Sequence, residues 1–167
     1  MTAQQSALPS RAAAARSRGP YALLALVVLA ADQATKALVR ARLVEGEAWP
    51  SRDAWLAISH VENSGAAFGM FQGAGPFLLA ATVVGVAAVL AFLLVTPAID
   101  RLYLGALSLI LGGASGNLID RLAKGTVTDF IDPTHYPAFN LADSAIVCGV
   151  LAVIAHSLFS GAREPAR

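Results

Sequence analysis

Two aspartates in the second half of the chain have the residue type and spacing for hydrolytic chemistry. Asp129 lies in the motif VTDF and Asp143 in FNLAD, at the threshold of a run from Ser144 to Ala162 without Asp, Glu, Lys or Arg. A lone carboxylate beside such a run is costly to desolvate. Two neighbouring carboxyls can share one proton, so that one accepts a proton from water while the other polarises a carbonyl. The pair predicts aspartic-protease chemistry.

A simpler interpretation of each aspartate stays open. Asp143 would also favour the positive end of a helix that begins near Asn140, which is suited to N-capping. Asp129 would then be a solvated loop acid. Asp132 in DFIDP competes with it as a partner for Asp143, although a proline turn follows.

Other polar residues lie close to apolar segments. Asp32 and Lys36 stand four apart, so on a helix they can pair on one face and lower each other's cost in a membrane. In GGASGNLIDR, Gly112 and Gly116 form a small-residue face that lets another helix approach. For Asp32 and Lys36 the pattern favours support of a site over direct chemistry. For Gly112 and Gly116 it predicts helix packing.

Three further residues could take part in binding. Arg121, which follows Asn117 by one helical turn, could orient a carboxylate or a lipid phosphate, or could serve as an ordinary interfacial anchor. Asn63 and Gly65 in ENSGAAFG occupy turn-like positions, which fit a tight turn or backbone held close to an extended peptide.

Membrane segments must position these residues, because the chain is 56% hydrophobic, 14% charged and has a mean hydropathy of +0.62. About 20 helical residues cross a bilayer. Four stretches qualify: residues 20–39, 76–95, 102–119 and 144–162. The alternative for the first is a signal peptide, with Arg11, Arg16 and Arg18 as its basic region. The helical pattern of DQATKALV beyond that region favours a membrane helix.

With four spans in series, all the polar motifs fall at the same side of the membrane. Lys and Arg number six on each side, so the positive-inside rule does not assign the compartment. In the first long loop, residues 44–75, the apolar residues Trp55, Ile58 and Val61 alternate loosely with polar neighbours. This pattern predicts a short strand and turn at the interface. A shared site at one membrane edge follows from this convergence.

Composition argues against several other classes. A net charge of +1 gives no basic excess for nucleic acid, and the three histidines are scattered without metal-ligand spacing, so neither nucleic acid, a metal nor a cofactor is predicted. Cys148 is single, which rules out an intramolecular disulfide, and we expect it to be a small buried side chain. A proton-coupled transporter using Asp32 or Asp143, and a structural membrane subunit, remain as rivals to an enzyme.

The motifs DQATK, NSGAAFG, GGASGNLIDR, VTDF and FNLADSAI occur together and in order between Pro20 and Phe159. In this order the chain resembles the lipoprotein signal peptidases, also called signal peptidase II. The resemblance implies a mainly α membrane protein with four transmembrane helices and a small extracytoplasmic β-rich cradle in the first loop. Because residues 1–19 lack large apolar residues, we expect them to form a disordered cytoplasmic tail. A single four-helix transmembrane peptidase domain (20–162) and a cytoplasmic tail (163–167) would follow.

Matched residue by residue, the resemblance implies that Asp129 and Asp143 are catalytic. The residues implied to line or support the site, together with those assigned above from their spacing, are Asp32, Lys36, Asn63, Gly65, Asn117, Arg121 and Asn140. Two departures stand out. The segment between VTDF and FNLAD looks short, and Thr128 occupies a position where a second apolar residue is common. The second difference is not expected to matter.

The resemblance also implies what the protein acts on. Its substrates would be prolipoproteins carrying a diacylglyceryl group, cut just before the lipidated cysteine, and its other partners would be membrane lipid and globomycin-type inhibitors. The implied location is the bacterial inner membrane, with both termini in the cytoplasm and the active site at the outer face.

Overall fold

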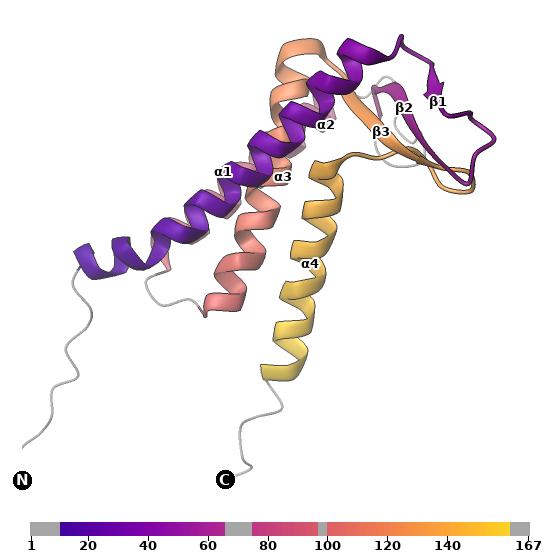
Figure 1. The fold of residues 1–167 in the computed structure, drawn as a ribbon. Coiled ribbons are helices and arrows are strands. Elements are labelled where there is room, and N and C mark those ends of the chain that lie inside the picture. The colour runs from indigo at the N-terminus through magenta and orange to yellow at the C-terminus, as the bar shows by residue number, and fades with distance from the viewer. Residues whose placement is uncertain (1–10, 66–74, 97–99, 161–167) are drawn as a thin grey trace, which may run out of the picture.

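The computed structural model describes residues 11–65, 75–96 and 100–160 of the 167-residue chain (Figure 1). Four long helices form a bundle with a small sheet at one end, which confirms the predicted mainly α fold. The elements in chain order are α1 (Arg11–Arg42), β1 (Ala48–Trp49), β2 (Leu56–Asn63), α2 (Gly75–Val95), α3 (Arg101–Lys124), β3 (Val127–Pro133) and α4 (Leu141–Ser160).

All four helices are long and apolar enough to cross a membrane, so the chain is a multi-pass membrane protein. The mean hydropathy of their apolar stretches ranges from 1.5 in α3 to 2.8 in α2. α2 has no buried residue. Because an all-round apolar helix without a buried face needs an apolar solvent, α2 fits a lipid environment on most sides.

The N-terminal part of the chain differs from the expectation of a disordered tail over residues 1–19. α1 begins at Arg11 and continues without interruption to Arg42. The run of alanines from Ala12 to Ala15 accounts for the difference, because alanine is the strongest helix former. The remaining predicted tail segments, 1–10 and 163–167, lie outside the described residues.

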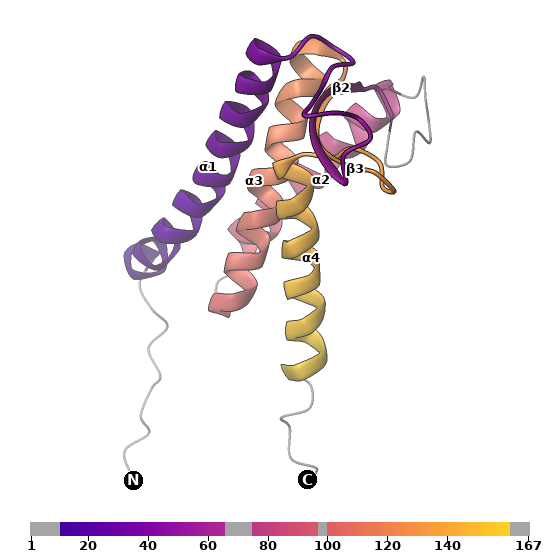
Figure 2. The same ribbon diagram turned by 45° about the vertical axis from the view of Figure 1, so that its right-hand side comes forward.

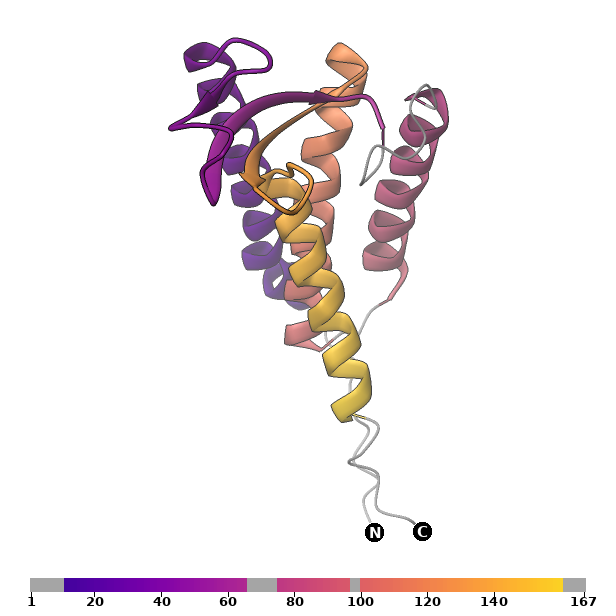
Figure 3. The same ribbon diagram turned by 90° about the vertical axis from the view of Figure 1, so that its right-hand side faces the viewer.

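α3 is the central helix, with α1 and α4 packed against it and α2 on its other side (Figure 3). The predicted small-residue face of α3 is confirmed and points at α1. A Cβ atom at Gly112 would come within 2.6 Å of the Ala25 carbonyl oxygen, and one at Gly116 would overlap the Asp32 carboxylate. The two helix backbones can therefore approach closely only because these positions lack side chains.

The sheet is antiparallel with strand order β1-β2-β3. The sequence predicted strand structure in the first loop, but β3, which carries Asp129, comes from the second long loop. Val61 of β2 pairs with Asp129, and Ile131 forms an isolated bridge to Phe139 on the other side of β3. The sheet therefore ties the two long loops together directly before α4 begins.

The sheet lies at one end of the bundle, whereas the first turn of α1 and the last turn of α4 lie at the opposite end (Figure 2). The predicted convergence of the polar motifs on one side is therefore confirmed. One smaller expectation was wrong: Cys148 is exposed on α4, where the next residue, Gly149, is the one that approaches Ala106 and Ile110 of α3.

Candidate active site

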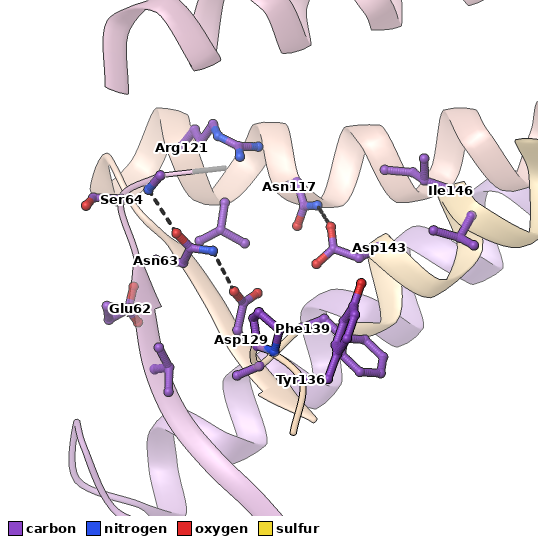
Figure 4. Close-up of a pocket in the computed structure, with 16 residues that line it drawn as sticks. Glu62, Asn63, Ser64, Asn117, Arg121, Asp129, Tyr136, Phe139, Asp143 and Ile146 are labelled. Atoms are coloured by element: carbon purple, nitrogen blue, oxygen red, sulfur yellow. Dashed lines mark hydrogen bonds between the residues drawn. The ribbon is translucent and has the colours of Figure 1, made fainter. Parts of the chain in front are cut away.

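A cavity of about 460 Å³ lies where the sheet meets the ends of α3 and α4 (Figure 4). Asp129 enters it from β3 and Asp143 from the first turn of α4, so the structure brings the two predicted catalytic residues to one site. Asp132, the competing partner, does not line the cavity. The remaining lining residues are Val61, Glu62, Asn63, Ser64, Gly65, Asn117, Arg121, Val127, Tyr136, Pro137, Ala138, Phe139, Ile146 and Val147.

Asp129 is not the solvated loop acid of the simpler interpretation, because it is only 2% exposed. Its Oδ2 accepts a hydrogen bond of 2.8 Å from the Asn63 side-chain amide, and its Oδ1 accepts one of 2.7 Å from the Asn140 amide. Burial raises the pKa of Asp129 to about 6, against those two hydrogen bonds, and the charge of Asp143 adds to the increase. Asp129 can therefore gain or lose a proton near neutral pH.

Asp143 both caps α4 and faces the cavity. The Asn140 side-chain oxygen accepts from the Asp143 backbone N–H at 2.9 Å, and Oδ2 of Asp143 lies 3.3 Å from the Asn140 N–H. This reciprocal arrangement is a capping box. The other carboxylate oxygen, Oδ1, accepts 2.7 Å from the Asn117 amide. The capping role in the simpler interpretation is thus present and leaves the carboxyl in the site.

Asn117 is oriented by a buried lysine. Lys36 Nζ donates to Asn117 Oδ1 at 2.8 Å, and Asn140 donates to the same oxygen at 3.2 Å. Because that oxygen receives two donors, the Asn117 NH₂ group must point toward Asp143. Lys36 therefore acts on the site through Asn117 and is not itself a lining residue.

The predicted ion pair between Asp32 and Lys36 is confirmed, at 2.8 Å and with both side chains fully buried. Lys36 also contacts a second acid, Asp120, whose Oδ2 lies 3.1 Å from Lys36 Nζ. The sequence did not indicate this contact. Asp32 also accepts the Ala142 backbone N–H at 3.0 Å and so caps α4 from α1. Such fixed partners do not suit the mobile proton carrier of the transporter hypothesis.

Asn63 and Gly65 form the predicted tight turn at the end of β2. The Gly65 N–H donates to the Asn63 side-chain oxygen at 2.8 Å, as in an Asx turn. This bond fixes the Asn63 amide so that its NH₂ group faces Asp129. The rest of the motif, residues 66–69, lies outside the described residues.

Arg121 lines the cavity from α3, on the side facing both aspartates (Figure 4). The structure gives it a 3.5 Å hydrogen bond to the Thr82 hydroxyl of α2 and no ion pair with either aspartate. Because a guanidinium carries five N–H donors, Arg121 has further donors for an acceptor within the cavity. Thr82 was not identified from the sequence, since a threonine in an apolar helix carries no local signal of its position.

Tyr136 and Phe139 are cavity residues that sequence analysis missed. They come from the segment between the two aspartate motifs and pack edge to face, with ring centroids 6.0 Å apart. The bridge between Phe139 and Ile131 folds this short segment back along β3. In the sequence, Phe139 opens the FNLAD motif and Tyr136 precedes it by three residues. This position is only a weak indication that the two rings line the site.

Comparison with known proteins gives a consistent result. The family model described as signal peptidase (SPase) II matches residues 24–159. A lipoprotein signal peptidase of Moorella thermoacetica is 42% identical over 132 residues, covering 79% of this chain and 88% of that protein. One from Shouchella clausii is 42% identical over 144 residues, covering 85% and 95% of the two chains.

Two solved structures share the fold. A bacterial membrane enzyme determined by the in meso method at 2.3 Å resolution matches with a TM-score of 0.82 and 31% identity, over 89% of this chain and 93% of that one. A second bacterial membrane enzyme, determined by the same method at 1.9 Å, matches with a TM-score of 0.75 and 33% identity, over 84% and 93%.

Proposed function

The chain belongs to the signal peptidase II family, and from that premise we propose that Asp129 and Asp143 are the catalytic pair with which it cuts its substrates. The protein is a membrane aspartic endopeptidase that removes signal peptides from prolipoproteins. The observation that carries the proposal is the meeting of these two carboxyls in one cavity, each held by an asparagine amide.

The pair works with one shared proton. The ionised carboxylate takes a proton from a water molecule as the water oxygen attacks the scissile carbonyl carbon, while the protonated carboxyl donates a hydrogen bond to the carbonyl oxygen. The intermediate then collapses, the C–N bond breaks, and the nitrogen receives a proton from the pair. A pKa of about 6 for Asp129 supports this chemistry, because a proton can be held or released there near neutral pH.

The asparagines keep both carboxyls in fixed orientations during this cycle. Asn63 and Asn140 hold Asp129, and Asn117 holds Asp143, with Lys36 and Asp32 behind them. Such preorganised donors reduce the reorganisation needed as charge moves through the site. We assign these residues a supporting role, and we assign Arg121 the binding of a substrate carbonyl or phosphate oxygen, because its guanidinium faces the cavity.

The side of the cavity formed by α4 supports a proposal for how a lipidated substrate is held. On α4 the lining runs from Asp143 to Ile146 and Val147, one turn into the apolar span, and Val147 is 55% exposed. A bond adjacent to a diacylglyceryl cysteine would thus meet the carboxyls while the acyl chains remain in the lipid. We infer cleavage just before that cysteine, at the outer face of the bacterial inner membrane, with both termini in the cytoplasm.

A cleavage assay tests the assignment. The purified protein in detergent is incubated with a diacylglyceryl-modified prolipoprotein, and the product is followed by gel shift. We expect the wild type to cut it, to ignore the unlipidated substrate and to be blocked by a globomycin-type inhibitor, whereas Asp129→Asn and Asp143→Asn fold but do not cut.

Asp132→Asn is the matched control, because Asp132 lies three residues from Asp129 on the same strand and does not line the cavity. It should keep wild-type turnover. Turnover by either Asp129→Asn or Asp143→Asn, or loss of turnover in Asp132→Asn alone, would contradict the assigned pair.

A further inference from the structure

Thr128, the residue before Asp129 in β3, is fully buried and has a hydroxyl in contact with charged groups from three other elements. Its Oγ1 lies 2.9 Å from an Arg40 nitrogen of α1, 2.5 Å from Lys124 Nζ of α3 and 2.9 Å from Glu62 Oε1 of β2. A hydroxyl has one donor and two acceptor positions. Thr128 therefore donates to Glu62, accepts from both cations and has its full hydrogen-bonding capacity in use.

Glu62 is the second centre of this cluster. Its carboxylate accepts from Lys124 at 3.1 and 3.2 Å and from Thr126, and its Oε1 lies 3.1 Å from Nε2 of His60. Burial raises the pKa of Glu62, but the hydrogen bonds from Thr126, Lys124, Thr128 and His60 outweigh it and lower the pKa to about 2. These hydrogen bonds therefore favour the charged form of Glu62.

The backbone of Thr128 is held as well as its side chain. Its N–H lies 3.3 Å from Asp120 Oδ2, and Arg40 lies 3.8 Å from the other oxygen of Asp120. Asp120 in turn contacts Lys36, which orients the Asn117 amide. One residue of β3 is therefore fixed to the ends of both α1 and α3.

The cluster around Glu62 and Thr128 lies next to the hydrogen bond from Asn63 to Asp129, on the same two strands. Glu62 lies between Val61, which pairs with Asp129, and Asn63, whose amide donates to Asp129 at 2.8 Å. Successive side chains of a strand point to opposite faces. Val127 and Asp129 line the cavity and Thr128 between them does not, so the Thr128 hydroxyl would act on Asp129 by fixing β2 and β3 relative to each other.

We propose that the Thr128 hydroxyl is a positioning element for the Asp129 carboxyl, joining Glu62 of β2 to Arg40 of α1 and Lys124 of α3 so that Asn63 stays within hydrogen-bond distance of Asp129. The proposal rests on the catalytic role assigned to Asp129. It also reverses the expectation that a threonine at this position would not matter.

Thr128→Val tests the hydroxyl alone, because valine has nearly the same shape. We expect kcat on the lipidated substrate to fall about 10- to 100-fold, as for a small misplacement of a catalytic group, with KM little changed. Thr128→Ser keeps the hydroxyl and should retain most of the turnover. Thr35→Val is the matched control, because the Thr35 hydroxyl donates to the Ala31 and Asp32 carbonyls of its own helix.

A second readout does not depend on catalysis. The Asp129 carboxyl can be titrated by NMR in detergent with ¹³Cγ-labelled aspartate, its signal being assigned by its loss in Asp129→Asn. The charged groups that face Asp129 are Asp143 of α4, Lys36 of α1 and Arg121 of α3, and none is altered in Thr128→Val. Weakening of the Asn63 hydrogen bond should therefore move the Asp129 midpoint to higher pH in Thr128→Val and leave it in place in Thr128→Ser.

If Thr128→Val does not fold, Thr126→Val removes one hydrogen bond from the same Glu62 carboxylate and should move the midpoint in the same direction by less. An unchanged Asp129 midpoint in the folded variant overturns the proposal, even if the melting temperature falls. If the wild type does not cleave the substrate, the proposed function fails, whereas the shift of the midpoint still decides whether Thr128 positions Asp129.

Discussion

The chain contains three asparagines, and all three lie at the carboxyl pair. Asn140 is the most connected: its oxygen caps α4 at Asp143, while its NH₂ group donates to Asp129 and to Asn117. The cap could be predicted from the order of residues in FNLAD. The bridge to Asp129 could not, because it depends on how β3 folds back beside α4.

Removing one donor from Asp129 should change its proton affinity. We expect Asn63→Ala to move the pH–rate limb near pH 6 to higher pH by about one unit, because a hydrogen bond to a charged group contributes about 1.5–3 kcal/mol. The sign follows from the bond: Asn63 stabilises the ionised form, so its loss makes Asp129 hold its proton to higher pH.

The pH dependence of kcat/KM in wild type, Asn63→Ala and Asp132→Asn measures this effect. The limb belongs to the pair and not to one residue, so only its displacement is interpreted. A limb that stays in place in Asn63→Ala, or moves equally in Asp132→Asn, would show that the Asn63 hydrogen bond does not tune Asp129.

At the level of elements, the four helices were predictable because long apolar runs carry a strong signal. β3 was missed for a physical reason. Val127, Thr128, Asp129 and Phe130 are all buried, so the strand shows no alternation of exposed and buried residues. The second acid beside Lys36 was missed too, because Asp120 lies on another helix, 84 residues away in sequence, and reaches Lys36 only through the close packing of α1 and α3.

That close packing makes a testable prediction for α3. Gly116→Ala places a Cβ against the Asp32 carboxylate, which Lys36 and the Ala142 N–H hold in position. We expect a loss of about 1–3 kcal/mol in unfolding free energy from overpacking. The measurement is the thermal unfolding midpoint in detergent.

Gly105→Ala is the control on the same helix, because a Cβ there meets no atom within 4 Å. Alanine should be neutral or stabilising at that position, since it favours the helix over glycine by up to about 1 kcal/mol. Equal midpoints for the two variants would mean that Gly116 is not required for the approach of α1.

At the scale of the whole molecule, the sheet lies at one end of the bundle (Figure 1). The cavity is lined by residues of β2 and β3 and by α3 and α4 residues next to the sheet. Family membership and the four membrane-length helices make this a multi-pass membrane enzyme. Charge does not orient it, because lysines and arginines divide equally between the two sides. We propose the orientation from the chemistry instead: a lipidated substrate that has crossed the membrane would present its bond at the outer face.

Cysteine accessibility tests that orientation with little engineering, since Cys148 is the one cysteine in the chain. In a Cys148→Ser background, Asp53→Cys places a thiol in the exposed stretch between β1 and β2. We expect a membrane-impermeant maleimide to label it in intact spheroplasts, because the proposed orientation places the sheet end at the outer face. Asp100→Cys, at the exposed position before α3 on the opposite side, should react only after permeabilisation. The reverse pattern would put the aspartates on the cytoplasmic side, where a substrate awaiting export could be cut before it is lipidated, and the proposed order of events would fail.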